Sequence, residues 1–226
     1  VWSTSLEIHN TGDGVAQIAL FFNRSNQNNT TPAASAQAEI QPKGTLVYGD
    51  LLLEAFELAE DVGSVAIVSS EPVLAHARIA NFGGAAGSFG QSAMAVPVAW
   101  ALGEDDVPGA NPDAGSATLF ECREDADFRC NLGIASVANV PLTIAVRAWI
   151  GPDATGTPLN LELEPFSHTQ VNRVLRSMGV SAAGGVRLEV SAGPGSSGRF
   201  FAYMSSVDNR SGDAVFLLGD REPTLP

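Results

Sequence analysis

The sequence contains two copies of one pattern, and this internal duplication constrains the fold more than any other feature. Ser5–Asn10 is similar to Asn131–Ser136, and Val15–Leu20 is similar to Pro141–Val146, both at a separation of 126 residues. Four further pairs of segments follow in the same order, at separations of 122 to 127 residues. Because six segments recur in one order, the sequence predicts two related domains that arose by duplication.

The four later pairs extend the match over most of each copy. They are Ala38–Pro42 with Leu161–Pro165, Asp50–Phe56 with Asn172–Met178, Gly63–Val68 with Gly185–Val190, and Val73–Arg78 with Phe200–Ser205. The second of these pairs is typical of a short helix, which we expect to begin at Asp50 in one copy and at Asn172 in the other, since Asp and Asn are good N-cap residues.

The other segments alternate apolar and polar residues with a period of two, as half-buried strands do. Turn residues separate them, as in Asn10–Gly14 and Gly151–Asp153. Six or seven short strands and one helix in about 95 residues favour an all-β fold of two tandem immunoglobulin-like sandwiches. We predict the first copy at 1–98, an acidic Pro/Gly linker at 99–116, the second copy at 117–220 and a tail at 221–226.

Composition limits the classes of partner. The formal net charge is −13, whereas proteins that bind nucleic acid or anionic membranes need the opposite sign. Hydrophobic residues make up 45% and charged residues 16% of the chain, which excludes a disordered chain. No apolar run is long enough for a membrane span.

Two cysteines, Cys122 and Cys130, are separated by seven residues. They do not match a zinc site, which needs four ligands. They fit a disulfide across a hairpin, which indicates an oxidising, extracytoplasmic compartment. The alternative is two buried, reduced thiols.

The chain starts with a strand-like pattern at Val1 and without a basic or apolar leader. A removed signal peptide or a cut from a larger chain would both give this start. We expect an extracellular or cell-surface protein. The first strand, with Val1, Trp2, Leu6 and Ile8, is a candidate for donation to the sheet edge of another molecule, because chain termini move easily.

The sequence shows no catalytic constellation. His9, His76 and His168 lie in unrelated segments, and neither a nucleophile elbow nor a histidine metal motif is present. We therefore expect no enzyme and no cofactor other than calcium. Loop oxygens suit that ion. The candidate ligands are Asp208, Asn209 and Asp213, with an Asx turn as the alternative, and the linker acids Asp105, Asp106, Asn111 and Asp113, with a solvated linker as the alternative.

Two further sets of residues are candidates for glycan chemistry. Three tryptophans could stack on sugar rings, namely Trp2, Trp100 and Trp149, although each could equally belong to a core or a domain end. N-x-S/T sequons occur at Asn23, Asn28, Asn29 and Asn209, and sequons of this kind mark exposed loops that can carry a glycan.

Several segments resemble a tandem module of large secreted bacterial proteins. Phe128–Ile134 resembles an F-R-x-N-L-G strand start, and Gln170–Arg173 resembles a Q-x-N turn into a short helix. Ala202–Asp213 resembles the V-D-N-R-S-G-D end of that module, with a match in the first copy at Gly87–Gln91. The resemblance implies an accessory or surface-exposed part and carries no catalytic residue. Cys130 replaces the small residue usual in the strand start.

Two functions follow from these patterns. The first is a non-enzymatic extracellular structural or adhesive protein, in its sharper form a filament subunit whose partner is itself, through sheet edges, or another surface protein or glycan. The alternative is a carbohydrate- or peptide-binding accessory module of a secreted hydrolase. That alternative predicts an exposed aromatic patch on one sheet face.

Overall fold

The computed structural model describes residues 2–82, 88–103, 115–181, 184–193, 196 and 198–221. Most of the predicted linker and tail, and with them the linker acids, lie outside the described residues. The chain divides into two compact units, one formed by Val1–Ser25 with Thr31–Val96 and the other by Asn26–Thr30 with Pro97–Pro226.

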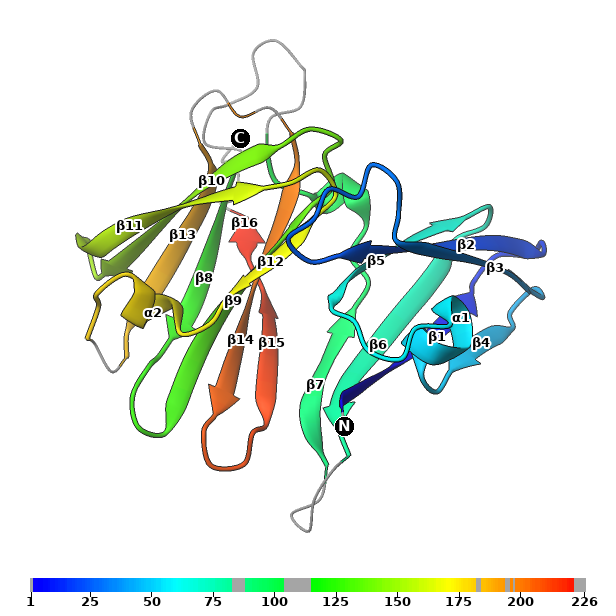
Figure 1. Ribbon diagram of the computed structural model, residues 1–226, viewed down its shortest axis with the longest axis horizontal. Coiled ribbons are helices and arrows are strands. Elements are labelled where there is room, and N and C mark those ends of the chain that lie inside the picture. Colours follow the sequence, from blue (N-terminus) through cyan, green and yellow to red (C-terminus); the bar gives the residue numbers. More distant parts are fainter. Residues whose placement is uncertain are drawn as a thin grey trace. The chain divides into compact units, whose positions relative to one another are not determined.

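The first unit consists of two antiparallel sheets in its described part, with the orders β4-β1-β6-β7 and β3-β2-β5 (Figure 1). Its elements are β1 (Trp2–Asn10), β2 (Ala16–Arg24), β3 (Ala34–Ile40), β4 (Thr45–Tyr48), α1 (Leu51–Phe56), β5 (Gly63–Ser69), β6 (Val73–Asn81) and β7 (Phe89–Met94).

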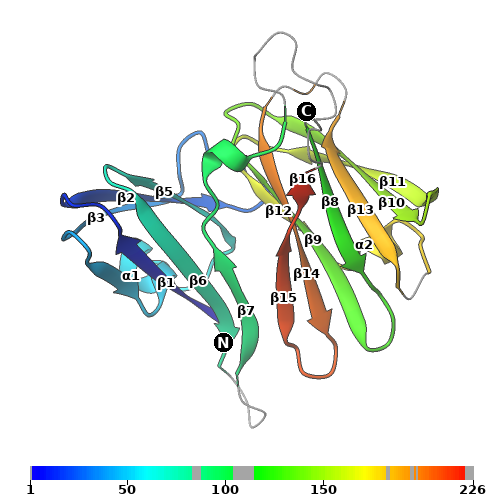
Figure 2. The same cartoon turned by 180° about the vertical axis from the view of Figure 1, so that it is seen from behind.

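The second unit also consists of two antiparallel sheets in its described part, with the orders β11-β10-β13-β8-β16 and β12-β9-β14-β15 (Figure 2). Its elements are η1 (Val98–Trp100), β8 (Ser116–Cys122), β9 (Phe128–Ser136), β10 (Leu142–Ile150), β11 (Asp153–Leu163), β12 (His168–Val171), α2 (Val174–Ser177), β13 (Val186–Ala192), β14 (Phe200–Asp208), β15 (Ala214–Leu218) and β16 (Asp220–Arg221).

Each unit has its own core, to which both of its sheets contribute. In the first unit Ile8 of β1 and Leu20 of β2 are fully buried in one cluster. In the second unit Ile134 of β9 and Ile144 of β10 are likewise fully buried in one cluster. Successive strand residues point to opposite faces, so the period-two pattern places one apolar face of each sheet inward. The prediction of an all-β fold with short helices is confirmed.

The strand orders repeat between the units. The seven strands β1–β7 recur in chain order as β9–β15, and both sheets keep the same neighbours. The register recurs too: Ile8 pairs with Ala75, and at the matching positions Ile134 pairs with Ala202. Strands β8 and β16 have no counterpart in the described part of the first unit. The duplication read from the sequence is therefore visible in strand order and register.

One of the six segment pairs was aligned one residue out of register. The sequence comparison set Gly63–Val68 against Gly185–Val190. In the structure Leu20 pairs with Ile67, whereas its counterpart Val146 pairs with Val190, so the true separation is 123 residues. A shift of one residue exchanges the two faces of a strand, and only burial or pairing reveals the error.

The assignment of strands to sheets differs from that of the immunoglobulin constant domain. There, strands A, B, E and D form one sheet and C, F and G the other. Here the first, fourth, sixth and seventh strands of each copy share one sheet, and the second, third and fifth share the other. What the copies have in common with that fold is the two-sheet architecture.

The two short helices are capped in different ways. Asp50 accepts a hydrogen bond from Leu53 N–H at 3.3 Å, as the sequence predicts. Asn172 does not cap α2: Arg173 occupies the N-cap position in a left-handed conformation, without a side-chain bond. The carboxylate of Glu124, from the loop after β8, instead accepts from Leu175 N–H at 2.8 Å and from Arg176 N–H at 3.2 Å.

Replacing Glu124 with alanine is expected to lower the free energy of unfolding of the second unit by about 1 kcal/mol, because two N–H groups at the start of α2 lose their acceptor. Chemical denaturation of the full chain measures this loss. Glu164→Ala is the matched control, since Glu164 is exposed. Equal losses in the two variants would contradict capping by Glu124.

Candidate functional site

A row of three side chains crosses one sheet of the second unit. Arg187 of β13 pairs with Trp149 of β10, and its guanidinium carbon lies 4.9 Å from the centre of the indole ring. On the other side of β13, Phe120 and Glu121 of β8 both lie opposite Arg187, because the register shifts between Val186 and Leu188. Such a two-against-one register is a β-bulge.

The bulge makes this segment unusual in two respects. Glu121 has a φ of 61°, a left-handed conformation that costs a non-glycine residue about 1–2 kcal/mol. Phe120 is 53% exposed, although it is a large apolar side chain in a strand. A second local cost lies beside it, since the indole N–H of Trp149 is buried without a hydrogen-bond partner among the described residues. Strain of this kind gathers at functional sites.

An open depression with a volume of about 770 Å³ adjoins this row. Its lining combines apolar, aromatic and charged groups, including Phe120, Glu121, Arg123, Phe128, Arg187 and Ser206. Sites for small-molecule ligands have volumes of about 300–1,000 Å³ and combine apolar and aromatic side chains with a few polar groups. The depression is therefore a candidate site.

The disulfide Cys122–Cys130 borders this site. Both cysteines are fully buried, and their Cα atoms are 5.6 Å apart. Cys122 directly follows the bulge, and Cys130 follows Phe128 by two residues. The predicted disulfide is thus present, and it ties the strand that carries Phe120 to the strand that carries Phe128.

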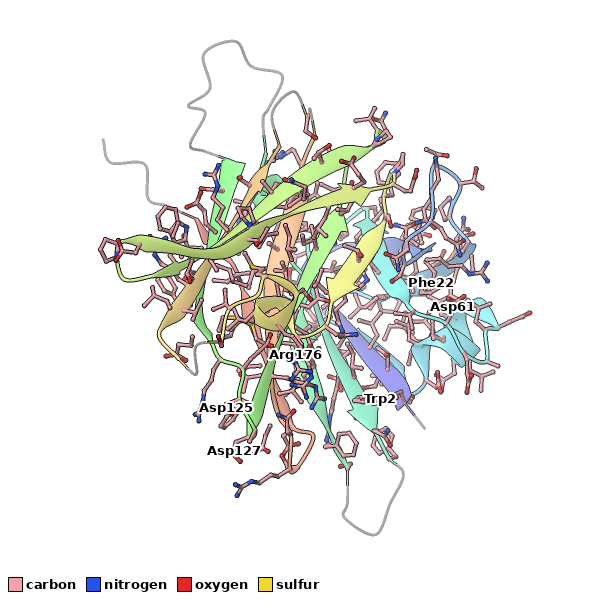
Figure 3. All side chains as sticks on the ribbon, turned by 60° about the vertical axis from the view of Figure 1, so that its left-hand side comes forward. Trp2, Phe22, Asp61, Asp125, Asp127 and Arg176 are labelled. Atoms are coloured by element: carbon pink, nitrogen blue, oxygen red, sulfur yellow. A yellow bond between two sulfur atoms is a disulfide. The ribbon has the colours of Figure 1, made fainter. Side chains whose placement is uncertain are left out.

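The loop inside the disulfide is ordered by its own polar contacts. Arg123 forms an ion pair with Asp125 at 2.5 Å and lies over the Phe128 ring at 4.4 Å. Desolvation alone would raise the pKa of Asp125, but the N–H groups of Phe128 and Asp127 and the Arg123 guanidinium outweigh it and hold that pKa below its usual value. Figure 3 shows Asp125 and Asp127 in this loop.

Among the predicted calcium ligands, Asn209 bonds the turn after β14 to the loop after β8, whereas Asp208 and Asp213 form bonds within the turn. The N–H groups of Arg210 and Ser211 donate to the Asp208 carboxylate and lower its pKa, which is the geometry of an Asx turn. Asn209 accepts from Arg129 at 2.8 Å and donates to the carbonyl of Ala126. Asp213 N–H donates to the Ser211 hydroxyl, and its carbonyl accepts from Asp208 N–H.

Comparison with known proteins adds little. Neither a protein-family model nor a curated protein matches this sequence. Among solved structures, one titled "Structure of allantoicase" aligns over 88% of this chain and 71% of its own, with 10% sequence identity and a TM-score of 0.23. A likeness at that level carries no argument about fold or activity.

No group of three or more His, Cys, Asp or Glu side chains that could hold a metal occurs within the described ranges. No helix described in the structure has the length and hydropathy of a membrane span.

The strand predicted for assembly lies inside its sheet. β1 pairs with β4 on one side and with β6 on the other, from Leu6 to His9 on the first side and from Trp2 to Asn10 on the second. Leu6 and Ile8 belong to the core, and Trp2 packs edge-on against Phe89. Val1 lies outside the described residues. Leu6–His9 therefore offer no unpaired backbone, so donation by the whole strand is corrected. Trp2–Ser5 pair with β6 alone among the described strands, and an assembly contact through them stays a prediction.

The structure separates the candidate glycan residues. Trp149 belongs to the row beside the depression, whereas Trp2 and Trp100 are exposed elsewhere. Of the four sequon asparagines, Asn23 and Asn29 are buried and Asn209 is bonded in its turn, whereas Asn28 is exposed. We expect a glycan on the folded chain at Asn28 before the other three.

The sequence analysis did not identify Phe120, Glu121 or Arg187 as site residues. One signal was available in the sequence: the period-two alternation from Ser116 to Leu119 breaks at Phe120, where a second apolar residue follows Leu119 directly.

His168 and Tyr203 form a separate buried pair in the second unit. Nε2 of His168 lies 2.7 Å from the Tyr203 hydroxyl, and the Tyr203 ring stacks on Phe216 and covers Gly133. A Cβ at Gly133 would clash with that ring, which explains glycine there. Burial lowers the pKa of His168 and raises the pKa of Tyr203 to about 12.

Stability of the second unit is expected to decline on both sides of neutral pH. The fold favours the protonated, neutral form of Tyr203. The stability that this preference contributes is therefore fully present below the unfolded pKa of 10.0 and is lost as the pH rises to the folded pKa of about 12. His168 also favours the neutral form, so its contribution is lost as pH falls from 6.5 through its lower folded pKa. Denaturation midpoints across pH measure both declines. Tyr203→Phe should flatten the alkaline decline, and an unchanged alkaline profile in that variant would contradict the assignment.

Proposed function

We propose that this chain is a non-enzymatic, extracytoplasmic structural or adhesive protein built from two copies of one sandwich module. The observation that supports this best is the recurrence of strand order and register, with Ile8 and Ile134 at equivalent positions. Among the described residues, each copy has a hydrophobic core of its own. The resemblance of Phe128–Ile134 and Ala202–Asp213 to modules of secreted bacterial proteins agrees with this role.

The disulfide supports the location. Disulfides form and persist in oxidising compartments such as the periplasm and the cell exterior, and are rare in the cytosol. Cys122 and Cys130 are paired and fully buried, and no free cysteine remains. An acidic protein of net charge −13 with this disulfide suits the cell surface better than a nucleic-acid-bound state.

Assembly, if it involves strand pairing, uses the outer strands of the sheets. β7 and β15 occupy equivalent edge positions in the two copies, and Met94 and Val215 are among the exposed large apolar side chains on them. β11 is a protected edge, because it contains Pro158, which lacks an N–H, and lies beside a bulge. Edge contacts between copies that do not close into a ring produce fibres.

Electron microscopy of the natively secreted protein, before and after reduction, tests this role. Ordered fibres or surface-bound assemblies support it. Recovery of the protein only in the cytosol, with Cys122 and Cys130 reactive toward a thiol reagent, would contradict it. Monodisperse particles in the medium would exclude the filament and leave adhesion.

A second candidate function has an observation of its own. A carbohydrate- or peptide-binding accessory module predicts an exposed aromatic patch on one sheet face. Phe120, which is 53% exposed, and Phe128 both line the depression, and the Trp149 ring lies under the Arg187 guanidinium. This function is compatible with an adhesive surface protein.

A further inference from the structure

We infer that the depression beside the β8 bulge binds an oligosaccharide that carries a carboxylate group, with Arg187 facing the carboxylate and Phe120 packing on a sugar ring. This inference rests on the second candidate function and specifies its ligand.

Charge at the depression differs from charge on the rest of the molecule. The chain has 25 acidic residues and 12 basic ones, whereas the lining of this depression has two arginines, Arg123 and Arg187, and one acidic residue, Glu121. Within the described residues no carboxylate lies at ion-pair distance from Arg187, whose guanidinium is instead held over Trp149 at 4.9 Å. A planar guanidinium fixed by stacking keeps its N–H groups available for a carboxylate, which it binds in a bidentate manner.

Arg123, unlike Arg187, is already paired with a carboxylate among the described residues. Its Nε atom is held by Asp125 at 2.5 Å and its guanidinium lies over Phe128, so its side chain keeps one orientation. Glu121 also lines the depression and adds negative charge. The Glu121 carboxylate can accept hydrogen bonds from sugar hydroxyls. It also repels a ligand that carries a negative charge at every position.

The aromatic component favours a sugar. Phe120 is 53% exposed and is placed at the rim by a bulge whose next residue, Glu121, is strained. An exposed aromatic face packs against the apolar C–H face of a pyranose ring, and a neighbouring cation adds attraction for an acid group on that ring. The volume of about 770 Å³ accommodates a ligand of a few sugar units.

Nucleic acid and other dense polyanions fit less well. The net charge of −13 repels a polymer with one phosphate per residue, and two arginines cannot offset this. An oligosaccharide with an isolated uronic acid satisfies both the Arg187 guanidinium and the aromatic face.

Isothermal titration calorimetry of the full chain with a trisaccharide that carries a single glucuronate residue tests the inference. The acidic trisaccharide is expected to bind, and its methyl-esterified form at least tenfold more weakly. Arg187→Gln and Phe120→Ala should each weaken binding by about tenfold. Arg176→Gln is the matched control, because Arg176 is an exposed arginine on α2 that does not line the depression. Circular dichroism confirms that each variant is folded.

The outcomes distinguish a failure of the proposed ligand class from a failure of the binding-module function on which it rests. Equal binding of the acid and its ester, still weakened about tenfold by Phe120→Ala, would overturn the carboxylate assignment and leave a glycan module. Binding of an acidic tripeptide in place of the sugar, sensitive to Arg187→Gln, would reassign the site to peptides. No binding by any of the three probes, or binding unaffected by both substitutions, would overturn the site itself without bearing on the structural role.

Discussion

Replacing Ile134 with alanine is expected to lower the free energy of unfolding of the second unit by about 2–5 kcal/mol. Ile134 is fully buried at the centre of its sheet, between β12 and β14. The substitution removes three carbon atoms from a close-packed core and leaves a cavity that neighbouring strands fill only in part. Because the register recurs, Ile8→Ala should cause a loss of the same size in the first unit, where Ile8 lies between β4 and β6.

Hydrogen–deuterium exchange under native conditions measures each unit separately, which a single melting temperature cannot do. Val215→Ala and Leu74→Ala are the controls, because Val215 is 59% exposed and Leu74 67% exposed on strands of the two units. Each control should change the free energy of opening, as measured by exchange, by less than 0.5 kcal/mol, because surface substitutions usually have effects of that size. A small effect of Ile8→Ala beside a large effect of Ile134→Ala would contradict the equivalence of the two positions.

The fold could be predicted from the sequence wherever the relevant information was local. Alternation of apolar and polar residues marked the strands around Ile8 and Ile134, and the repeat of that alternation revealed the duplication. The Asp50 cap was predictable as well, because its partner lies three residues away. In each case one segment of the chain contained the whole signal.

What could not be predicted depends on contacts between distant segments. Glu124 caps α2 from 51 residues away, so the local Asn172 was chosen in its place. β1 became an inner strand because β4 and β6 pair on its two sides, and terminal position alone does not reveal that.

The candidate site was missed for the same reason. Arg187 and Trp149 are 38 residues apart in the sequence and meet only through strand pairing, and Phe120 reaches them through a bulge. Trp149 alone was identified, since a tryptophan is conspicuous in any segment.

Removing the disulfide is expected to lower the free energy of unfolding of the second unit by about 2–3 kcal/mol, the value that chain entropy gives for so short a loop. The double variant Cys122→Ser and Cys130→Ser loses this constraint on the unfolded chain. It also places two hydroxyls at fully buried positions, so the double variant Cys122→Ala and Cys130→Ala should lose less. Thermal denaturation of the oxidised wild type, the reduced wild type and both variants measures these differences.

Loss of the disulfide should destabilise some segments of the second unit more than others. The bulge at Glu121 is held next to Cys122, and the loop with Arg123 and Asp125 lies between the two cysteines. We therefore expect amide exchange to rise first in residues 120–130 and only later in β10 and β13. The first unit contains no cysteine and serves as an internal control, since its exchange should not change on reduction. Uniform loss of protection over the whole second unit, including its core strands, would show that the disulfide stabilises the entire sandwich rather than the strained segment that lines the depression.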